Sequence, residues 1–383
     1  MLDSSSRCWA EVELGYIKHN VAEIRKMISS TTKIMGVVKA NAYGHGDVAV
    51  AKALKACGVD FFAVSSVDEA LNLRNAGIEE PVLILGYTPS IHFHYLHEYN
   101  MIQTLISYEY AQELSAYALQ ANVLIHAHIK VDTGMTRLGV SCKKEKWDID
   151  TVKAMYQMPQ IQTEGIFSHF SVSDSLNNSD DLAFTKHQIA YFDQVLTELK
   201  ESGIDPGITH LQNSYGIMNY PQLSYDYVRP GLLHLGVTAD DSIVTNQKPS
   251  FRPIMTWKAN ISFVREVEKG CCVSYGRNYT AQKRMKIATV SCGYADGYPR
   301  IVSNQGMQVL VHGVRCEIIG NICMDQMMVD VSALNEVKSG EEVVLFGYDH
   351  GVLLPVDELS RCAHTINNEA LCWLSARVPR IYK

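Results

Sequence analysis

Segments with the hydrophobic pattern of strands alternate with segments that have the hydrophobic pattern of helices, from residue 9 to residue 237. Short apolar runs have the pattern of strands buried in a parallel sheet, and the segments between them place apolar residues at helical spacing. The expected strands are 9–14, 34–38, 61–64, 82–85, 102–106, 125–131, 162–167, 208–212 and 233–237. The expected helices are 17–28, 48–57, 67–76, 108–120, 149–158 and 181–202.

The strands from 34–38 to 233–237 alternate with helices and predict an N-terminal (β/α)8 TIM-type barrel over residues 16–245. We expect the segment 1–15 to carry a first strand that packs with the C-terminal domain. From residue 246 the pattern changes to apolar strand-like runs separated by Gly-containing turns, with one helical segment near 356–363. The expected fold class is therefore α/β + β, with residues 246–383 forming a mostly β domain.

Composition narrows the class of protein. The net charge is −7 with no basic block, which argues against nucleic acid or an anionic membrane as a partner. No uninterrupted run of about 18 apolar residues is present, so we expect no membrane contact by this chain itself. The ten cysteines show no CxxC pair and no Cys/His metal spacing, so we expect no metal site and a cytoplasmic location.

The stretch 34–47 holds the first candidate for chemistry. Its apolar run brings Lys39 to the mouth of a buried strand, and a loop of small residues follows. Burial of an ammonium group is costly unless the group is paired or neutralised, and a neutral amine is what an imine-forming lysine needs. The alternative is a lysine that extends from a strand end into solvent.

Two loops late in the predicted barrel are candidates for phosphate binding. Asn213 and Ser214 follow the strand 208–212, and Arg229 and Gly231 precede the strand 233–237. Phosphate groups in TIM-type barrels bind the loops near the last two strands, although turn chemistry alone would also explain both loops. Together with Lys39, these loops indicate a phosphorylated cofactor held as an imine.

Arg229 would lie beneath such a cofactor. Its guanidinium group only donates hydrogen bonds, so it would leave a pyridine nitrogen unprotonated. An ion pair at the barrel rim is the alternative. Tyrosines in the motifs VSYGRNY (273–279) and CGYADGY (292–298) could act as bases if nearby cations lowered their pKa, or they could simply pack.

The motifs VVKANAYGHG, KVDTGMTRLG, SHF, VSYG, CGYADGY, NICMDQ and ARVPRIY occur in this order. Together they resemble alanine racemases, the fold-type III pyridoxal-phosphate enzymes, over the chain from Trp9 to Tyr382. The resemblance implies pyridoxal 5'-phosphate as the cofactor, a small amino acid as the substrate, and a head-to-tail homodimer with shared active sites.

The resemblance also implies a role for individual residues. Lys39 would hold the cofactor and act as one of two bases, and Tyr275 of the partner subunit would be the other. Arg229 matches the partner of the pyridine nitrogen, with His169 bonded to it. The positions that match the phosphate-binding residues of the family are Tyr43, Asn213, Ser214, Gly231 and Leu232.

The substrate side follows from the same resemblance. Arg137 matches the residue near the cofactor phenolate and the substrate carboxylate, and the partner's Met324 would offer a backbone N–H to that carboxylate. Lys130 matches a lysine that is carbamylated in some members of the family.

One position departs from the family pattern. A motif near the C-terminus reads Asn-Tyr in typical members, whereas here it reads Asn367-Asn368. A carboxamide in place of the phenol opens volume beside the substrate and supplies a donor and an acceptor, so a serine hydroxymethyl group could be bound there. Asn368 is therefore the candidate for substrate preference, and it resembles the racemase domain of the membrane-bound serine racemases of vancomycin-resistance clusters.

We therefore expect a racemase of serine and alanine that supplies D-amino acids for cell-wall precursors, in the setting of vancomycin resistance. This chain would be the catalytic part of a membrane-anchored protein. The first alternative is a housekeeping alanine racemase for peptidoglycan. A more distant alternative is a non-catalytic pyridoxal-phosphate-binding protein, although such proteins lack the β domain.

Overall fold

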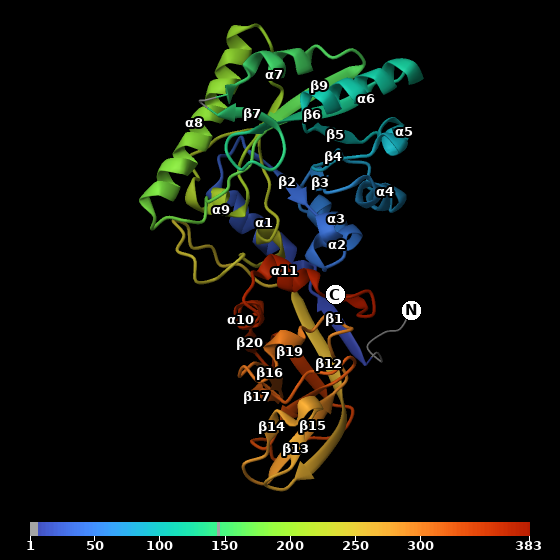
Figure 1. The fold of residues 1–383 in the computed structure, drawn as a ribbon, viewed down its shortest axis with the longest axis vertical. Helices are drawn as coiled ribbons and strands as arrows, with labels where there is room; N and C mark the ends of the chain where they lie inside the picture. Colours follow the sequence, from blue (N-terminus) through green and yellow to red (C-terminus); the bar gives the residue numbers. More distant parts are fainter. Residues whose placement is uncertain (1–6, 144–145) are drawn as a thin grey trace.

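The computed structural model describes residues 7–143 and 146–383 and has two parts arranged end to end (Figure 1). The first part is a closed barrel of eight parallel strands in the order β2-β3-β4-β5-β6-β9-β10-β11, in which β11 pairs back to β2. The strands are β2 (Lys33–Val37), β3 (Phe61–Val64), β4 (Val82–Ile84), β5 (Ile102–Leu105), β6 (Ile125–Asp132), β9 (Ile161–Phe167), β10 (Ile208–His210) and β11 (Tyr227–Val228). The predicted (β/α)8 barrel is confirmed.

Helices cover the outside of the barrel (Figure 1). They are α1 (Gly15–Met27), α3 (Asp47–Ala56), α4 (Val67–Asn75), α5 (Phe93–Glu98), α6 (Tyr108–Ala121), α7 (Ile149–Tyr156), α8 (Ser179–Glu201) and α9 (Ser214–Asn219). The short strands β7 (Val140–Lys143) and β8 (Lys146–Trp147) extend the sheet beyond β6. Several helices begin where a side chain accepts a hydrogen bond from the first turn, as Ser66 does for α4 and Ser107 for α6.

The last predicted strand of the barrel is wrong. Residues 233–237 contain a 3-10 helix, η2 (Leu233–Leu235), and the eighth strand is β11, which lies before Arg229. The run is apolar because Leu233 and Leu235 are buried in the core beneath the barrel helices, not because it pairs in a sheet. Arg229 and Gly231 therefore follow the eighth strand, at the same end of the barrel as the other candidate residues.

Two further differences concern the first half of the barrel. The sequence pattern predicts no helix between 82–85 and 102–106, yet η1 (Ser90–His92) and α5 occupy this segment, where only Phe93 and Leu96 supply a buried helical face. Lys39 was expected to end its strand, but β2 ends at Val37 and Lys39 begins a separate turn.

The second part is a mostly β domain, as predicted. Strands β12, β15, β18, β17, β16 and β19 pair in this order, and β19 also pairs with β12, so the six strands form a closed ring. The strands of this part are β1 (Cys8–Val12), β12 (Met255–Val267), β13 (Cys272–Val273), β14 (Tyr279–Thr280), β15 (Met285–Val290), β16 (Gln308–Val311), β17 (Val314–Ile319), β18 (Met327–Asp330), β19 (Glu342–Asp349), β20 (Val352–Leu354) and β21 (Arg380–Tyr382).

The N-terminal strand β1 belongs to this second sheet, where it pairs antiparallel with β12 and parallel with β21. Two short helices, α10 (Val356–Cys362) and α11 (Asn367–Cys372), lie between the sheet and the barrel (Figure 1). None of the helices in the described part of the chain has the length and apolar character needed to cross a membrane.

Candidate active site

A cavity of about 510 Å³ lies at the C-terminal end of the barrel strands. Its walls come from the loops that follow most of the strands, with one residue from α11. Every predicted site residue except Tyr275 and Met324 lines this cavity: Lys39, Tyr43, Arg137, His169, Asn213, Ser214, Arg229, Gly231, Leu232 and Asn368. The sequence-based expectation that these residues meet in space therefore agrees with the structure.

Lys39 begins a left-handed turn, α2 (Lys39–Tyr43). Ala40, Asn41, Ala42 and Tyr43 all have φ between 49° and 55°. Left-handed backbone costs about 1–2 kcal/mol for each L-residue other than asparagine, so Ala40, Ala42 and Tyr43 carry about 3–6 kcal/mol of strain that their surroundings must offset.

Residues distant in the sequence hold this turn in place. The carboxylate of Glu69 accepts hydrogen bonds from the backbone of Ala40 at 2.7 Å and of Ser65 at 2.6 Å. At the other end, Arg380 Nε donates to the carbonyl of Gly44 at 2.8 Å, and its remaining N–H groups donate to carbonyls in the segment 374–378. Hydrogen bonds from the barrel and from the C-terminal segment thus fix opposite ends of the turn.

The surroundings of Lys39 favour its neutral form. Burial lowers the pKa of Lys39, and the positive charge of Arg137 lowers it further, while Glu69 opposes both effects. Neutralisation by burial is what distinguishes a lysine that can attack a carbonyl from one that only carries charge.

A second group of residues in the cavity has the chemistry of a phosphate cradle. The Gly231 N–H points to Ser214 Oγ at 3.2 Å, and Asn213 caps the first turn of α9. Burial raises the pKa of the Tyr43 phenol, so its hydroxyl stays protonated and able to donate. A Cβ on Gly231 would come within 2.5 Å of that hydroxyl, so only glycine permits this close approach. Hydroxyls and backbone N–H groups that converge in this way fit a phosphate group.

Arg229 lies at the floor of the cavity and is held by several acceptors. Its Nη2 donates to the carbonyls of Ser168 (2.7 Å) and Leu211 (3.1 Å) and to His169 Nδ1 (3.1 Å). Its Nη1 lies 2.7 Å from His210 Nδ1. Burial and Arg137 lower the pKa of Arg229 to about 9, so the guanidinium group still carries its charge at pH 7.

The histidines around Arg229 are neutral. Burial and the charge of Arg229 lower the pKa of His169 and of His210 well below the usual range, and lower that of His128 to about 3. Because the guanidinium group only donates, His210 Nδ1 accepts from Arg229 and His210 Nε2–H donates to His128 Nδ1 at 2.9 Å. This chain of bonds holds Arg229 in one orientation beneath the cavity.

Lys130 also lines the cavity. It is buried, with its ammonium nitrogen 4.6 Å from the centre of the Phe167 ring, and burial together with Arg229 and Arg137 lowers its pKa well below the usual value. Whether it is carbamylated stays a prediction from the family resemblance.

Tyr275 and Met324 lie elsewhere, on the surface of the β domain. Their side chains are 71% and 54% exposed. Asn321 Nδ2 donates to the carbonyl of Tyr275 at 2.7 Å, and the backbone N–H of Tyr294 donates to the carbonyl of Cys323 at 3.1 Å. The three motifs around residues 275, 294 and 324 therefore form one surface, which we call the tyrosine patch (Tyr275, Tyr294 and Met324).

Sequence reasoning missed four residues that support the site, namely His128, His210, Glu69 and Arg380. His128, Lys130 and Asp132 occupy alternate positions of β6, so polar residues at a spacing of two within an apolar strand were the available signal for His128. No comparable signal shows that Glu69 or Arg380 bonds to the Lys39 turn, because their partners in that turn are backbone groups 29 and 336 residues away in the sequence.

Comparison with known families identifies related proteins. The family described as "Alanine racemase, N-terminal domain" matches residues 12–239, and "Alanine racemase, C-terminal domain" matches residues 254–382. The chain is 41% identical to an alanine racemase of Desulforamulus reducens over 98% of both chains. It is 40% identical to a serine/alanine racemase of Enterococcus gallinarum, matching 94% of this chain but 49% of that protein.

Solved structures agree with these relatives. An alanine racemase of Clostridium difficile 630 superposes with a TM-score of 0.91 at 35% identity, covering 100% of this chain and 97% of that one. An alanine racemase of Bartonella henselae, solved with covalently bound pyridoxal phosphate, gives a TM-score of 0.84 at 27% identity and covers 99% of this chain and 100% of that one.

Proposed function

The chain belongs to the alanine racemase family, and we propose that it interconverts L- and D-alanine with pyridoxal phosphate as its cofactor. The observation that carries this proposal is the cavity at the barrel mouth. It combines a half-buried lysine of lowered pKa, a cradle suited to phosphate, and a buried arginine that stays charged.

The residues of the cavity fit the cofactor. Lys39 would hold it, and Tyr43, Asn213, Ser214, Gly231 and Leu232 would bind its phosphate. Pyridoxal phosphate, when bound, withdraws electrons and makes the Cα–H of an amino acid acidic. Arg229 would donate a hydrogen bond to the ring nitrogen without protonating it, and His169 and His210 keep its guanidinium group in place.

Racemisation needs a base on each face of the Cα carbon. Lys39 is one of these bases in our proposal, and Tyr275 of the partner subunit is the other. One takes the proton from one enantiomer while the other returns a proton to the opposite face. Arg137, which lines the cavity, would bind the substrate carboxylate together with a backbone N–H from the partner's Met324.

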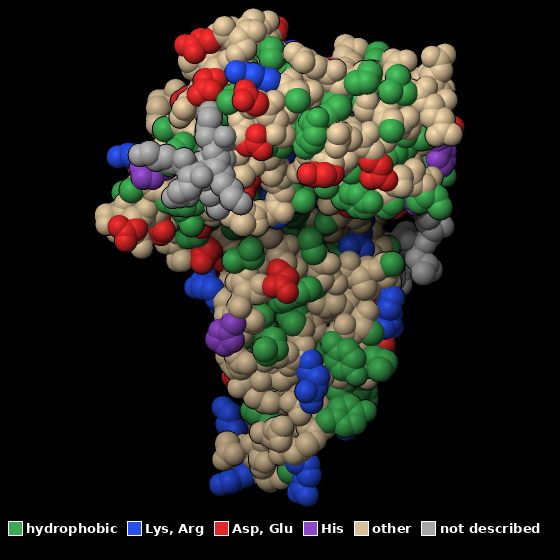
Figure 2. Space-filling model, turned by 45° about the horizontal axis from the view of Figure 1, so that its top comes forward, with side chains coloured by type: hydrophobic (Ala, Val, Ile, Leu, Met, Phe, Trp, Pro, Cys, Tyr) green, Lys and Arg blue, Asp and Glu red, His purple; other side chains and the backbone are tan. Residues whose placement is uncertain are grey.

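Two features support a head-to-tail dimer. The tyrosine patch is exposed in a single chain, and its Tyr275 could supply the second base that the proposed reaction in the cavity requires. On the face that Figure 2 shows, Lys and Arg side chains gather at the free end of the β domain and most of the visible Asp and Glu side chains lie over the barrel. Opposite charges at the two ends favour pairing of one β domain with the barrel of a second copy.

Serine is a second candidate substrate. Asn368 lines the cavity, where its carboxamide could hydrogen-bond a hydroxymethyl group. The Asn367-Asn368 pair in the sequence favours serine, but the relatives named alanine racemase favour alanine as the principal substrate. The serine/alanine racemase of Enterococcus gallinarum supports serine as an additional substrate, and this chain spans about half of its length. The names of these relatives do not mention vancomycin resistance, so the comparisons do not support that part of the sequence-based expectation.

The test is a racemisation assay of the purified holoenzyme with L-alanine and L-serine, read by chiral chromatography. We expect both substrates to react, alanine faster. Asn368→Tyr should lower the ratio of serine to alanine turnover about tenfold, because the phenol refills the space beside the substrate, whereas Asn368→Gln keeps the carboxamide. An unchanged ratio in Asn368→Tyr would refute the role of Asn368. Cofactor absorbance without exchange of the Cα hydrogen would instead favour the non-catalytic alternative.

A further inference from the structure

A second cavity, of about 390 Å³, lies between the barrel and the β domain. One stretch of backbone separates it from the active site, because Val237 and Thr238 line this cavity whereas Ala239 lines the active-site cavity. Its volume lies in the range of small-molecule sites, which is about 300–1,000 Å³.

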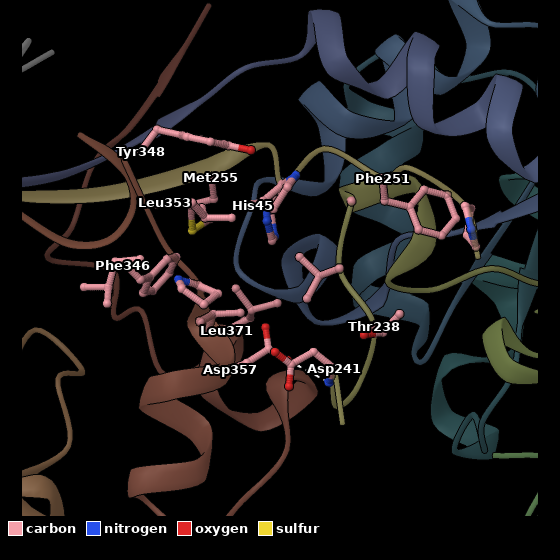
Figure 3. Close-up of a pocket in the computed structure, with 18 residues that line it drawn as sticks. His45, Thr238, Asp241, Phe251, Met255, Phe346, Tyr348, Leu353, Asp357 and Leu371 are labelled. Carbon is pink, nitrogen blue, oxygen red and sulfur yellow. Dashed lines mark hydrogen bonds between the residues drawn. The ribbon is translucent and has the colours of Figure 1, made fainter. Parts of the chain in front are cut away.

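The walls of this cavity are largely apolar. Met255, Phe346 and Leu353 form one side and Phe251 lies across from them (Figure 3). Neither a lysine nor an arginine is among the described residues that line it. The nearest cation that the structure pairs with a lining residue is Arg361, whose Nη2 lies 3.5 Å from Asp241 Oδ2 at the edge of the cavity. A ligand with a carboxylate or phosphate would therefore find no cation in the described lining itself.

His45 supplies an unsatisfied acceptor in this wall. Its Nδ1 lies 3.0 Å from the carbonyl of Ala42 and 2.9 Å from that of Tyr43. Because carbonyls only accept, Nδ1 carries the hydrogen and Nε2 is left as a bare acceptor. The side chain is fully buried, Nε2 has no partner among the described residues, and burial lowers the pKa of His45 to about 4, so the ring is neutral.

Carboxylates supply the other polar end. Asp357 and Asp241 lie side by side at the edge of the cavity, and Asp357 Oδ1 accepts from the backbone of Asp241 at 3.0 Å (Figure 3). The same oxygen accepts from Asn367 Nδ2 at 2.6 Å. Asp241 already pairs with Arg361 at 3.5 Å, whereas no lysine or arginine of the described residues forms an ion pair with Asp357, which is 8% exposed. Asp357 is therefore the carboxylate that a bound cation would pair with.

We propose that this cavity is a second binding site, which takes a small amphipathic amine with an apolar body. Its ammonium group would pair with Asp357 and Asp241, and a hydroxyl or other neutral donor at its far end would bond to His45 Nε2. This ligand class satisfies both polar ends, and the apolar walls bury its body. An amino-acid substrate would bring a carboxylate into a cavity whose described lining supplies no cation.

The site is joined to the active site on two sides. His45 holds the carbonyls of Ala42 and Tyr43, which belong to the left-handed turn of Lys39. Asn367 bonds to Asp357 and to the carbonyls of Thr238 and Ala239, and the next residue is Asn368. A ligand that fixes His45 and Asp357 would therefore rigidify both the turn and the position of Asn368.

The probe for this site is N,N-dimethyltyramine, a tertiary amine that cannot form an imine with the cofactor. Its binding to the holoenzyme is measured by calorimetry, with and without saturating alanine. Two variants accompany the wild type. Leu353→Trp fills the cavity, and Val352→Trp places the same side chain on the neighbouring exposed position, which does not line the cavity.

We expect one probe per chain, with an affinity that alanine leaves unchanged. Leu353→Trp should abolish binding, Val352→Trp should retain it, and Asp357→Asn should weaken it about tenfold through loss of the charge. Bound probe should slow amide hydrogen exchange in residues 39–46. The carboxylate analogue 3-(4-hydroxyphenyl)propionate should not bind.

Three results would overturn the proposal: no binding to the wild type, binding that survives Leu353→Trp, or competition with alanine, which would place the probe in the active site. These readouts do not involve racemisation. The failure of this proposal would therefore leave the proposed function standing, and the failure of the proposed function would leave this site standing.

Discussion

The barrel cavity and the tyrosine patch differ in how they hold their side chains. In the cavity, Arg229 is buried and bonded to two carbonyls and two histidines. On the patch, Tyr275 and Met324 stand largely in solvent, with backbone bonds fixing their loops but little holding the side chains. One chain therefore brings together the residues that fit the cofactor, while in our proposal Tyr275 acts as the second base only when another chain meets the patch. Cofactor binding and turnover should separate experimentally.

The largest effect is expected at the centre of the cavity. Lys39→Ala should lower racemisation more than about 1,000-fold, since both the attachment point of the cofactor and one base are lost. The imine absorbance of the cofactor should disappear with it, as measured by spectrophotometry. Lys33→Ala, at an exposed lysine that begins the preceding strand β2, is the control and should leave both properties intact. Retained turnover in Lys39→Ala would refute our assignment.

Mixing two inactive variants tests directly whether Tyr275 of the patch acts in the active site of the other chain. Tyr275→Phe should lower turnover about 100- to 10,000-fold while cofactor binding persists. In a mixture with Lys39→Ala after subunit exchange, half of the dimers would be mixed and each would carry one intact site. Activity should then return to about a quarter of the wild-type value. The absence of any recovery, with exchange confirmed by mass spectrometry, would mean that Tyr275 serves its own chain or no site at all.

An intermediate effect is expected in the phosphate cradle. Gly231→Ala places a Cβ within 2.5 Å of the Tyr43 hydroxyl and displaces it, so the dissociation constant of pyridoxal phosphate should rise about tenfold. Gly15→Ala is the matched control, because a Cβ there meets nothing within 4 Å. Equal cofactor affinities in the two variants would show that this contact does not shape the cradle.

The smallest effect is a change in pH dependence. Arg137 lowers the pKa of Lys39, so Arg137→Met should raise that pKa, and the neutral amine should appear only at higher pH. The rate at which apoenzyme takes up pyridoxal phosphate should therefore rise with pH in both proteins, with a higher midpoint in the variant. Stopped-flow absorbance measures this rate. A midpoint that moves to lower pH would contradict the proposed influence of Arg137.

The sequence allows most of the barrel to be predicted, because strands buried on both faces read as continuous apolar runs. The eighth strand fails this rule. Tyr227–Val228 is too short to stand out, whereas residues 233–237 are apolar for another reason, namely burial of η2 in the core. The family motifs predict the candidate site, and the structure brings all the predicted site residues of the barrel together in one cavity.

What could not be predicted depends on contacts between distant segments. The left-handed turn has no sequence signal, since Ala40, Asn41, Ala42 and Tyr43 do not favour positive φ as a group. Its conformation comes from Glu69, Arg380 and the packing of Gly46 against Tyr382. The bonds between His128, His210 and Arg229 likewise arise from barrel closure, which brings side chains from separate strands together.

The hydrogen bond from Arg380 to Gly44, at the end of the Lys39 turn, has a consequence for biosynthesis. Gly44 and Arg380 are separated by 336 residues in the chain. At a synthesis rate of about 5–20 residues per second, the lysine segment waits about 20–70 seconds before the ribosome has made the residue that secures it. The strained backbone around Lys39 is therefore among the last parts of the protein to mature, and a nascent barrel reaches its cofactor-ready form only after the β domain has been translated.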